Sequence, residues 1–309
     1  MNVTRPSETV QGRVLVTGHR GFTGRFLVDK LEAAGYIVQG LCERPDDRDS
    51  PGIDLLDRPA VRRAIDAARP QAVVHLAAIA FVAHGDAEAM YRTNVVGTRN
   101  LLEALAELDV APQAVLLASS ANIYGNSARE VIDESVEPSP ANDYAVSKLA
   151  MEYMARLWSD RLPLVVTRPF NYTGVGQTLN FLLPKIVSHF QRGEKIIELG
   201  NIDVARDFQD VRFVGDAYTR LLAARERSIG QIVNVCSGVS VSLTQVIAMM
   251  QEIAGYDIEV RVNPAFVRGH EVARLTGDNS RLRDLIGELD IIPLRTTLEW
   301  MYANPTSII

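Results

Sequence analysis

Short apolar runs alternate with amphipathic stretches through the first half of the chain. The apolar runs have the length of buried strands and cover Arg13–Thr17, Ile37–Cys42, Ala72–Leu76, Ala114–Ala118 and Leu164–Thr167. The stretches between them repeat their apolar residues with helical spacing, over Gly24–Ala34, Pro59–Ala68, Glu88–Leu108 and Asn142–Trp158. Strands that alternate with helices form parallel sheets, whose crossover helices cover both faces. We therefore predict an α/β protein with a doubly wound parallel sheet.

The second half of the chain loses this alternation. The segments rich in turn-forming and polar residues are Asn171–Gln177 and Asn201–Asp207. One more buried strand is predicted at Ile232–Cys236, and the Pro-, Gly- and Arg-rich stretch Asn263–Gly277 predicts a loop that covers a ligand. The expected organisation is a first domain over residues 1–170 and a smaller lobe over residues 171–309, with segments around 203–238 that return to the first domain.

Composition and charge restrict the classes of partner. The chain has 309 residues, of which 47% are hydrophobic, and 32 basic against 38 acidic residues give a net charge of −6. Nucleic-acid binding requires a basic face, so we expect no nucleic-acid partner. No apolar run approaches the ~20 residues that span a bilayer, and the polar start of the chain is unlike a signal peptide. With two cysteines far apart, Cys42 and Cys236, we expect a cytoplasmic enzyme with no membrane partner.

A glycine-rich turn follows the first predicted strand and opens the first predicted helix. It reads Thr-Gly-His-Arg-Gly-Phe-Thr-Gly, and its candidate cofactor contacts are Gly18, Arg20, Gly21, Phe22 and Gly24. Glycines let the backbone turn sharply and approach a pyrophosphate, whose charge the helix N-terminus stabilises. The spacing differs from the more common Gly-x-Gly-x-x-Gly, and an ordinary strand–helix turn is the alternative interpretation. The order of strand, turn and helix favours a dinucleotide-binding loop.

The type of nicotinamide cofactor depends on residues near the end of the second strand. An acidic residue there binds the ribose hydroxyls of NAD(H), whereas arginine accommodates the 2′-phosphate of NADP(H). The chain has both, as Glu43 followed by Arg44, and Arg20 in the glycine turn offers a second guanidinium group. Two arginines against one glutamate slightly favour NADP(H) over NAD(H), although each is also an ordinary surface charge.

Tyr144 and Lys148 are four residues apart in a predicted helix and therefore lie on one helix face. A free tyrosine has a pKa of ~10, and a nearby ammonium group lowers this pKa toward neutrality. Such pairs are also common on helix surfaces. Ser119 and Ser120 at the carboxyl end of the fourth strand strengthen a catalytic interpretation, because doubly wound sheets bind ligands at that edge. Turn capping is the alternative role for these serines.

Five motifs occur in a fixed order along the chain. They are the glycine turn, Val73–Ala78 (VVHLAA), Ser119–Gly125 (SSANIYG), Tyr144–Lys148 (YAVSK) and Arg168–Asn171 (RPFN). Through them the chain resembles the extended short-chain dehydrogenase/reductases that act on nucleotide sugars, from about Arg13 to Met301. The resemblance implies a Rossmann fold with a smaller C-terminal substrate lobe.

The resemblance also implies roles for individual residues. Ser120, Tyr144 and Lys148 match the catalytic set, with Tyr144 as the acid. The matching cofactor contacts are Tyr144, Lys148, Asp54, Leu55, Leu76, Ala77 and Ala78.

The residues after Ser120 distinguish the reactions of this family. The 4,6-dehydratases carry Asp-Glu there, whereas this chain has Ala121 and Asn122, neither of which can move a proton during elimination. The second half is most similar to GDP-6-deoxy-4-keto-D-mannose reductases, through Arg168–Gln177, Gly200–Val211 and Asn234–Gly238. The expected reaction is NAD(P)H-dependent reduction of the 4-keto group of a nucleotide-linked 6-deoxy sugar. A nucleotide-sugar 4-epimerase is the alternative.

A nucleoside-diphosphate sugar, with a GDP-linked one favoured, needs cations for its diphosphate and polar groups for its hydroxyls. The candidates are Arg206, Lys185 and Arg268 for the diphosphate, Glu271 for the ribose, and Asn171 for phosphate or sugar. Salt bridges are the equally weighted alternative, among Arg206, Asp207 and Asp210 or between Arg268 and Glu271.

Two apolar helix faces, within Val95–Leu108 and Ala145–Trp158, predict packing surfaces and, as in relatives, a homodimer. A cofactor-binding sensor without turnover is the non-catalytic alternative. The intact set of Ser120, Tyr144 and Lys148 argues against it.

Overall fold

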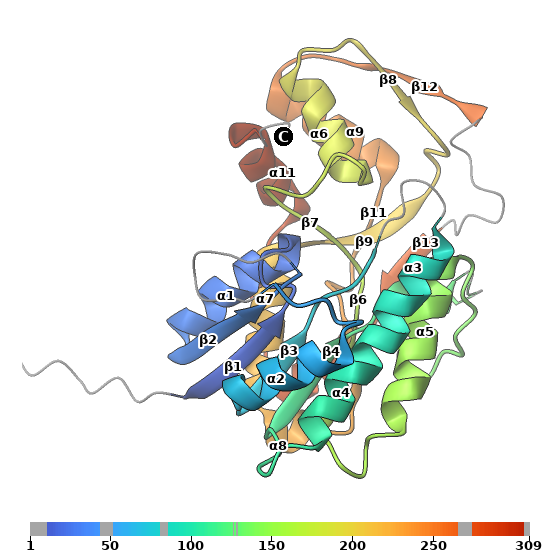
Figure 1. Ribbon diagram of the computed structural model, residues 1–309. Coiled ribbons are helices and arrows are strands. Elements are labelled where there is room, and N and C mark those ends of the chain that lie inside the picture. Colours follow the sequence, from blue (N-terminus) through green and yellow to red (C-terminus); the bar gives the residue numbers. More distant parts are fainter. Residues whose placement is uncertain are drawn as a thin grey trace, which may run out of the picture. The chain divides into compact units, whose positions relative to one another are not determined.

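Figure 1 shows the computed structural model of the chain, which describes residues 11–43, 52–80, 86–125, 127, 129–264 and 274–305. Contacts divide the chain into two compact units. The first unit comprises Met1–Ala118, Ala150–Val166 and Tyr218–Gln231, and the second comprises Ser119–Leu149, Thr167–Ala217 and Ile232–Ile309. These units follow from contacts alone, so the division of cofactor and substrate roles at residue 170 stays a prediction.

The first unit is built on a parallel sheet. Its strands are β1 (Gly12–Thr17), β2 (Tyr36–Leu41), β3 (Ala72–His75), β4 (Ala114–Ala118) and the start of β6 (Leu164–Pro169). The six-stranded sheet has the order β10-β6-β4-β3-β1-β2, with β10 at Ile232–Val235. β1 pairs in parallel with β2 and β3, and β3 pairs in parallel with β4. The predicted parallel α/β architecture is therefore confirmed, and each apolar run of the first half is a strand.

Helices connect these strands close to the predicted positions. They are α1 (Phe22–Ala33), α2 (Arg58–Ala68), α3 (Ala87–Tyr91), the π-helix η1 (Arg92–Gly97), α4 (Thr98–Ala106), α5 (Asp143–Arg156), α7 (Val211–Ala223) and α8 (Arg225–Ser228). One core packs residues of α2, α4 and α5 against Leu15, Val73 and Val115 of the sheet (Figure 1). Val14 and Val16 point to the opposite face of β1 and are also buried, so the sheet is covered on both faces.

The helix predicted over Glu88–Leu108 is interrupted, which corrects the expectation of one regular helix. It consists of α3, η1 and α4, and η1 has the wider π-helical turn. Asn94 in η1 is buried, and its side chain accepts from Ile79 N (2.8 Å) and donates to Ile79 O (3.1 Å). The widened turn accompanies this pair of hydrogen bonds to the segment after β3. Apolar periodicity does not report such bonds, because they depend on a distant backbone.

The second unit combines small sheets with helices. Its remaining elements are η2 (Ala121–Tyr124), β5 (Val131–Ile132), β7 (Asn171–Thr173), α6 (Leu182–Gln191), β8 (Ile196–Leu199), β9 (Ala205–Asp210), β11 (Ser240–Ser242), α9 (Leu243–Ala254), β12 (Glu259–Val262), β13 (Arg274–Gly277), α10 (Ser280–Ile286) and α11 (Leu294–Ala303). One sheet has the order β11-β9-β13-β5, with β7 also paired to β9, and β8 pairs with β12. α6, α9 and α11 share an apolar core that includes Ile186, Met250 and Leu298.

Three segments predicted as turns or loop contain strands, which corrects the sequence-based expectation. β7 begins at Asn171, β9 begins at Ala205, and β13 forms the end of the loop predicted over Asn263–Gly277. The polar residues of these segments have buried partners: Asp207 in β9 is 1% exposed and accepts hydrogen bonds from Ser237. A polar side chain that is satisfied by a partner distant in sequence resembles a turn residue when the sequence is considered alone.

Helix length and polarity bear on the membrane question. Within the described part of the chain, no helix has the length and apolar character required to cross a bilayer.

Candidate active site

The glycine turn lies against the ends of β2 and β3. The Gly18 amide donates to Leu41 O at 2.9 Å, and Gly18 has a φ of +71°, which favours glycine. A Cβ atom on Gly18 would lie 2.9 Å from the Ala77 nitrogen, and one on Gly24 would collide with the Gly18 carbonyl oxygen. The structure therefore brings Gly18, Gly24 and Ala77 together at a separation that side chains do not permit.

The start of α1 suits an anionic group. Gly21 is the N-cap residue and has no side chain with which to cap the helix, and the first turn of α1 contains no acidic residue. The backbone amides and the positive end of the helix dipole favour a negative charge at this position. Together with the backbone cradle that forms where Gly18 packs against Ala77 without room for a Cβ atom, these residues fit the pyrophosphate of a dinucleotide.

The residues predicted to select the cofactor are only partly described. Arg20 is exposed in the turn, and Glu43 is exposed beyond β2. Phe22 begins α1, where its ring meets the Phe26 ring edge-on with 5.9 Å between centroids. Arg44 lies outside the described residues, so its comparison with Glu43 stays a prediction.

The other predicted cofactor contacts occupy loops after β2 and β3. Asp54 is exposed, and its carboxylate accepts from Leu56 N at 2.8 Å. Leu55 is buried in the core of the first unit, and its carbonyl accepts from the Asn100 side chain at 2.9 Å. Leu76 and Ala78 are half-buried directly after β3. Leu55 therefore packs as a core residue, whereas the other three side chains are at least partly accessible.

A buried chain of hydrogen bonds, which the sequence did not predict, runs beside the glycine turn. Thr17 Oγ1 lies 2.7 Å from His75 Nδ1, and His75 Nε2 lies 2.8 Å from Thr98 Oγ1. The Thr98 hydroxyl donates to Asn94 O, so His75 carries its proton on Nε2 and donates to Thr98. Thr17 then donates to Nδ1 and accepts from the Ala77 amide at 3.2 Å. The only signal in the sequence is that Thr17 and His75 end neighbouring parallel strands.

The serine and tyrosine predicted to act together are hydrogen-bonded. Ser120 follows β4 and begins η2, where its side chain accepts from the Asn122 amide at 3.2 Å. Its hydroxyl also forms a hydrogen bond with the Tyr144 phenol. Asn142 stabilises the first turn of α5, because its Oδ1 accepts from Ala145 N at 2.9 Å. Ser120 therefore caps a turn and contacts the tyrosine at the same time.

The pKa of Tyr144 is raised, so the lowered pKa predicted from Lys148 is wrong for this structure. Burial, which disfavours the phenolate, is the largest cause; the neighbouring Tyr172 raises the pKa further, and the hydrogen bond from Ser120 lowers it. Lys148 lies one helical turn beyond Tyr144 in α5 and is itself buried. Tyr144 thus holds its proton at neutral pH, as a general acid requires.

The predicted substrate residues that are described belong to the second unit. Asn171 begins β7, and Arg206 lies in β9, where its guanidinium donates to Ala205 O at 2.9 Å. Lys185 in α6 donates to Glu198 O at 3.1 Å. The other two predicted contacts, Arg268 and Glu271, lie outside the described residues.

Asp207 and Asp210, which the salt-bridge alternative pairs with Arg206, interact with other residues in the structure. Asp210 pairs with Arg212, with 2.6 Å between charged atoms, and Asp207 accepts from Ser237 and Gly238. Asp207 is buried, and burial raises its pKa against the effect of these hydrogen bonds. Asp207 therefore organises backbone amides within the second unit.

Tyr172, which the sequence did not single out, is one of the residues that raise the pKa of Tyr144. It follows Asn171 of the RPFN motif, and in the structure it is half-buried and electrostatically coupled to Tyr144. A polar aromatic residue directly after a recognised motif is the only sequence signal that could have identified it.

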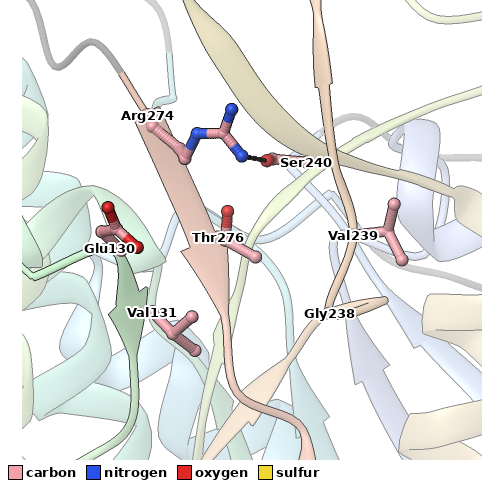
Figure 2. A pocket seen from close by; sticks show the side chains of 7 residues that line it. All are labelled: Glu130, Val131, Gly238, Val239, Ser240, Arg274 and Thr276. Carbon is pink, nitrogen blue, oxygen red and sulfur yellow. Dashed lines mark hydrogen bonds between the residues drawn. The ribbon is translucent and has the colours of Figure 1, made fainter.

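The second unit also contains a hollow that is lined by other residues than those described above (Figure 2). Its volume is about 270 Å³, and its walls are formed by Glu130, Val131, Gly238, Val239, Ser240, Arg274 and Thr276. Arg274 extends from β13 and donates to Ser240 Oγ at 3.2 Å. Val131 and Val239 are 52% and 60% exposed. The predicted site residues that the structure describes do not line this hollow.

Comparisons with known proteins cover nearly the whole chain. The family model for the NAD dependent epimerase/dehydratase family matches residues 14–236. GDP-6-deoxy-D-talose 4-dehydrogenase from Aggregatibacter actinomycetemcomitans is 35% identical, over 94% of this chain and 97% of its own length. GDP-6-deoxy-D-mannose reductase from Pseudomonas aeruginosa is also 35% identical, over 93% of this chain and 94% of its own length.

Solved structures extend this similarity to the fold. A candidate epimerase from Burkholderia cenocepacia J2315 is 52% identical with a TM-score of 0.88, over 95% of this chain and 97% of its own. RMD from Pseudomonas aeruginosa, solved in complex with NADPH, is 32% identical with a TM-score of 0.82, again over 95% and 97%. Sequence, fold and the order of the motifs therefore agree, and the chain belongs to the NAD dependent epimerase/dehydratase family, the nicotinamide-dependent enzymes of nucleotide sugars.

Proposed function

We propose that this protein reduces the 4-keto group of a GDP-linked 4-keto-6-deoxy sugar, with Tyr144 as the acid. The observation that carries the proposal is the hydrogen bond between Ser120 and a Tyr144 whose raised pKa keeps it protonated. A reduced carbonyl needs a proton on its oxygen, and a protonated phenol supplies one. The names of the two relatives, a GDP-6-deoxy-D-talose 4-dehydrogenase and a GDP-6-deoxy-D-mannose reductase, support the substrate class.

The residues around Tyr144 have different roles in the proposed reduction. When bound, the reduced nicotinamide supplies the hydride. Tyr144 protonates the oxygen on C4, and the hydroxyl of Ser120, which lowers the pKa of Tyr144, stabilises the phenolate that remains. Lys148, one helical turn away in α5, is the expected third member of the set. Ala121 and Asn122 cannot act as acid and base, which argues against dehydration.

Cofactor binding is assigned to the domain over residues 1–170, and NADP(H) is favoured over NAD(H). The cradle at Gly18 and the uncapped start of α1 support a pyrophosphate there. Arg20 in the turn supports the additional 2′-phosphate, and Arg44 is expected to add to it. The NADPH complex of RMD, a protein of the same fold, is consistent with this preference.

The substrate lobe over residues 171–309 is proposed to bind the nucleoside diphosphate. Arg206 and Asn171 belong to the neighbouring strands β9 and β7, and Lys185 in α6 adds a third cationic or polar group. Arg268 and Glu271 complete the proposed contacts. Cations of this kind neutralise a diphosphate without a basic surface overall, which agrees with a net charge of −6.

A direct assay tests the reaction. Purified protein supplied with GDP-4-keto-6-deoxy-D-mannose and NADPH should oxidise one NADPH for each sugar reduced, measured as loss of NADPH absorbance. Tyr144→Phe should lower kcat by about 10²- to 10⁴-fold, because it removes the proton donor. If the wild-type protein oxidises neither NADPH nor NADH in proportion to the sugar, the reductase proposal is wrong.

A 4-epimerase is the second candidate, favoured by the similarity to the Burkholderia cenocepacia structure. An epimerase interconverts the two C4 configurations of a nucleotide sugar without net consumption of cofactor. Incubation of the purified protein with GDP-mannose, without added cofactor and followed by NMR, would reveal a second C4 epimer. Binding of NADPH without either reaction would instead support the sensor.

We also propose that the protein forms a homodimer in the cytoplasm. Val96 and Leu157 are 46% and 82% exposed on the two predicted helix faces, where a partner would bury them. Both cysteines are free thiols, as expected in a reducing compartment. Light scattering coupled to gel filtration measures the dimer directly, and Leu157→Glu should weaken it.

A further inference from the structure

A chain of buried, hydrogen-bonded polar side chains crosses the first unit beside the glycine turn. Its members are Thr17, His75, Thr98 and Asn94, which are 0%, 2%, 1% and 1% exposed. They come from the end of β1, the end of β3, α4 and η1, and all belong to the first unit. A connected polar network in a buried, low-dielectric region holds its members in one arrangement, so this chain is a rigid part of the unit.

Both ends of this chain finish on the backbone of segment 76–79, which follows β3. At one end, the Thr17 hydroxyl accepts from the Ala77 amide at 3.2 Å. At the other end, the Asn94 side chain accepts from the Ile79 amide at 2.8 Å and donates to the Ile79 carbonyl at 3.1 Å. The two middle members of the chain connect these ends to each other. Segment 76–79 is therefore held at two points by one network.

This segment forms one wall of the proposed pyrophosphate cradle. The Ala77 nitrogen lies 2.9 Å from the position that a Cβ atom on Gly18 would take. The Leu76 amide also donates to the Thr17 carbonyl at 3.2 Å, which joins the segment to the strand that leads into the glycine turn. Because the cradle is this closely packed, a small shift of the Ala77 backbone changes its shape. The Thr17 hydroxyl, which bonds to the Ala77 amide, thus helps to set the geometry of the cradle.

The proton on the His75 ring determines the direction of every hydrogen bond in the chain. Thr98 gives its hydroxyl proton to Asn94 O at 2.7 Å, so it accepts a proton from His75 Nε2 at 2.8 Å. The neutral ring then has a lone pair on Nδ1, and the Thr17 hydroxyl donates to it at 2.7 Å. This bond turns a lone pair of the Thr17 oxygen toward the Ala77 amide. Without an acceptor at Nδ1, the Thr17 hydroxyl can rotate and point its own proton at that amide.

We propose that His75 is a positioning residue for the nicotinamide cofactor. Its neutral ring, protonated on Nε2, orients the Thr17 hydroxyl, which holds the Ala77 amide and with it the cradle against Gly18. This role rests on the proposed cofactor site and deepens it, because His75 is buried and acts through Thr17. A merely structural histidine would only need to fill its space in the core.

Two substitutions separate these roles, because each keeps one half of the hydrogen bonding of the ring. In His75→Asn, the amide oxygen takes the place of Nδ1 and still accepts from Thr17, while the bond to Thr98 is lost. In His75→Gln, the terminal amide reaches the place of Nε2 and still donates to Thr98, while the acceptor for Thr17 is lost. Fluorescence titration measures the affinities of both variants and the wild type for NADPH and NADH. Urea denaturation measures their stabilities.

His75→Gln should weaken binding of the preferred cofactor by about tenfold, the loss expected for one hydrogen bond, whereas His75→Asn should stay within about threefold of the wild type. Their stabilities should be similar, because each variant loses the ring and one of its hydrogen bonds. Equal affinities of the two folded variants would overturn the role of His75.

A second measurement keeps the test decisive if either variant fails to fold. Nitrogen NMR of the wild type without cofactor should show the His75 ring neutral and protonated on Nε2, and a proton on Nδ1 would overturn the proposal. Thr17→Val removes the hydroxyl itself and should weaken cofactor binding as much as His75→Gln, and unchanged binding would likewise overturn the proposal. A wild-type protein that binds neither NADPH nor NADH would instead overturn the proposed cofactor site.

Discussion

Arg168 binds both the ring and the hydroxyl of Tyr124. Its guanidinium carbon lies 5.0 Å from the Tyr124 ring centroid, and its Nη1 donates to the Tyr124 hydroxyl at 2.9 Å. The same hydroxyl donates to Asn234 Oδ1 at 2.7 Å, and all three side chains are buried. Two of the motifs that identify the family therefore meet in one polar cluster. In this chain these motifs therefore contribute to packing as well as to the candidate site.

This cluster yields a prediction about stability. Tyr124→Phe removes a hydroxyl that accepts from a buried cation and donates to a buried amide, so Arg168 and Asn234 each lose one hydrogen bond. We expect the free energy of unfolding to fall by about 1–3 kcal/mol, measured by urea denaturation. Tyr153→Phe, at an exposed tyrosine, is the matched control and should leave it unchanged. Equal stability of both variants would show that the cluster contributes little.

A second prediction separates backbone strain from close packing in the glycine turn. Gly18→Ala combines a φ of +71° with a Cβ that meets the Ala77 backbone, whereas Gly230→Ala has a φ of +79° with nothing within 4 Å. Gly230→Ala should cost about 1–2 kcal/mol of unfolding free energy from φ alone. Gly18→Ala should cost more and should also weaken NADPH binding, measured by fluorescence titration. Equal losses, with NADPH binding intact, would contradict the proposed cradle.

A third prediction concerns the buried carboxyl of Asp207. Burial raises its pKa above the ordinary value of 3.8, so in the pH window between the two values the unfolded chain has lost its proton and the folded protein retains it. As the pH rises through that window, Asp207 therefore makes the free energy of unfolding fall. Asp207→Asn removes this contribution. As the pH rises through the same window, the free energy of unfolding of the variant should therefore fall less, or rise more, than that of the wild type. Urea denaturation at several pH values from mildly acidic to neutral measures both slopes, and parallel curves would argue against the raised pKa.

A fourth prediction follows from the raised pKa of Tyr144. Because burial disfavours the phenolate, Tyr144 should remain protonated and active as an acid from neutral to mildly alkaline pH. We expect kcat for NADPH oxidation to stay level until the pH exceeds the ~10 of an ordinary tyrosine. The ultraviolet difference spectrum between the wild type and Tyr144→Phe reports the phenolate without relying on activity. Phenolate that appears near neutral pH would contradict the structure and support the lowered pKa expected from Lys148.

The sequence predicted the architecture and part of the site for identifiable reasons. Each apolar run of the first half became a strand because buried parallel strands are continuously apolar, and this property is local. β7, β9 and β13 were hidden because their polar residues, such as Asp207, are satisfied by partners far away in the chain. The π-helical turn at Asn94 was hidden for the same reason, since Ile79 supplies both of the bonds described above.

The placement of Tyr144 and Lys148 on one helix face was determined by the sequence, because a helix repeats every 3.6 residues. The sequence also determined the order of strand, glycine turn and helix that suits a dinucleotide. Only the tertiary structure brought Ser120 to Tyr144, because these residues come from separate elements. It also reversed the expected direction of the Tyr144 pKa. Spacing along a helix shows which charge is near, whereas the loss of water around a phenol depends on everything that packs against it.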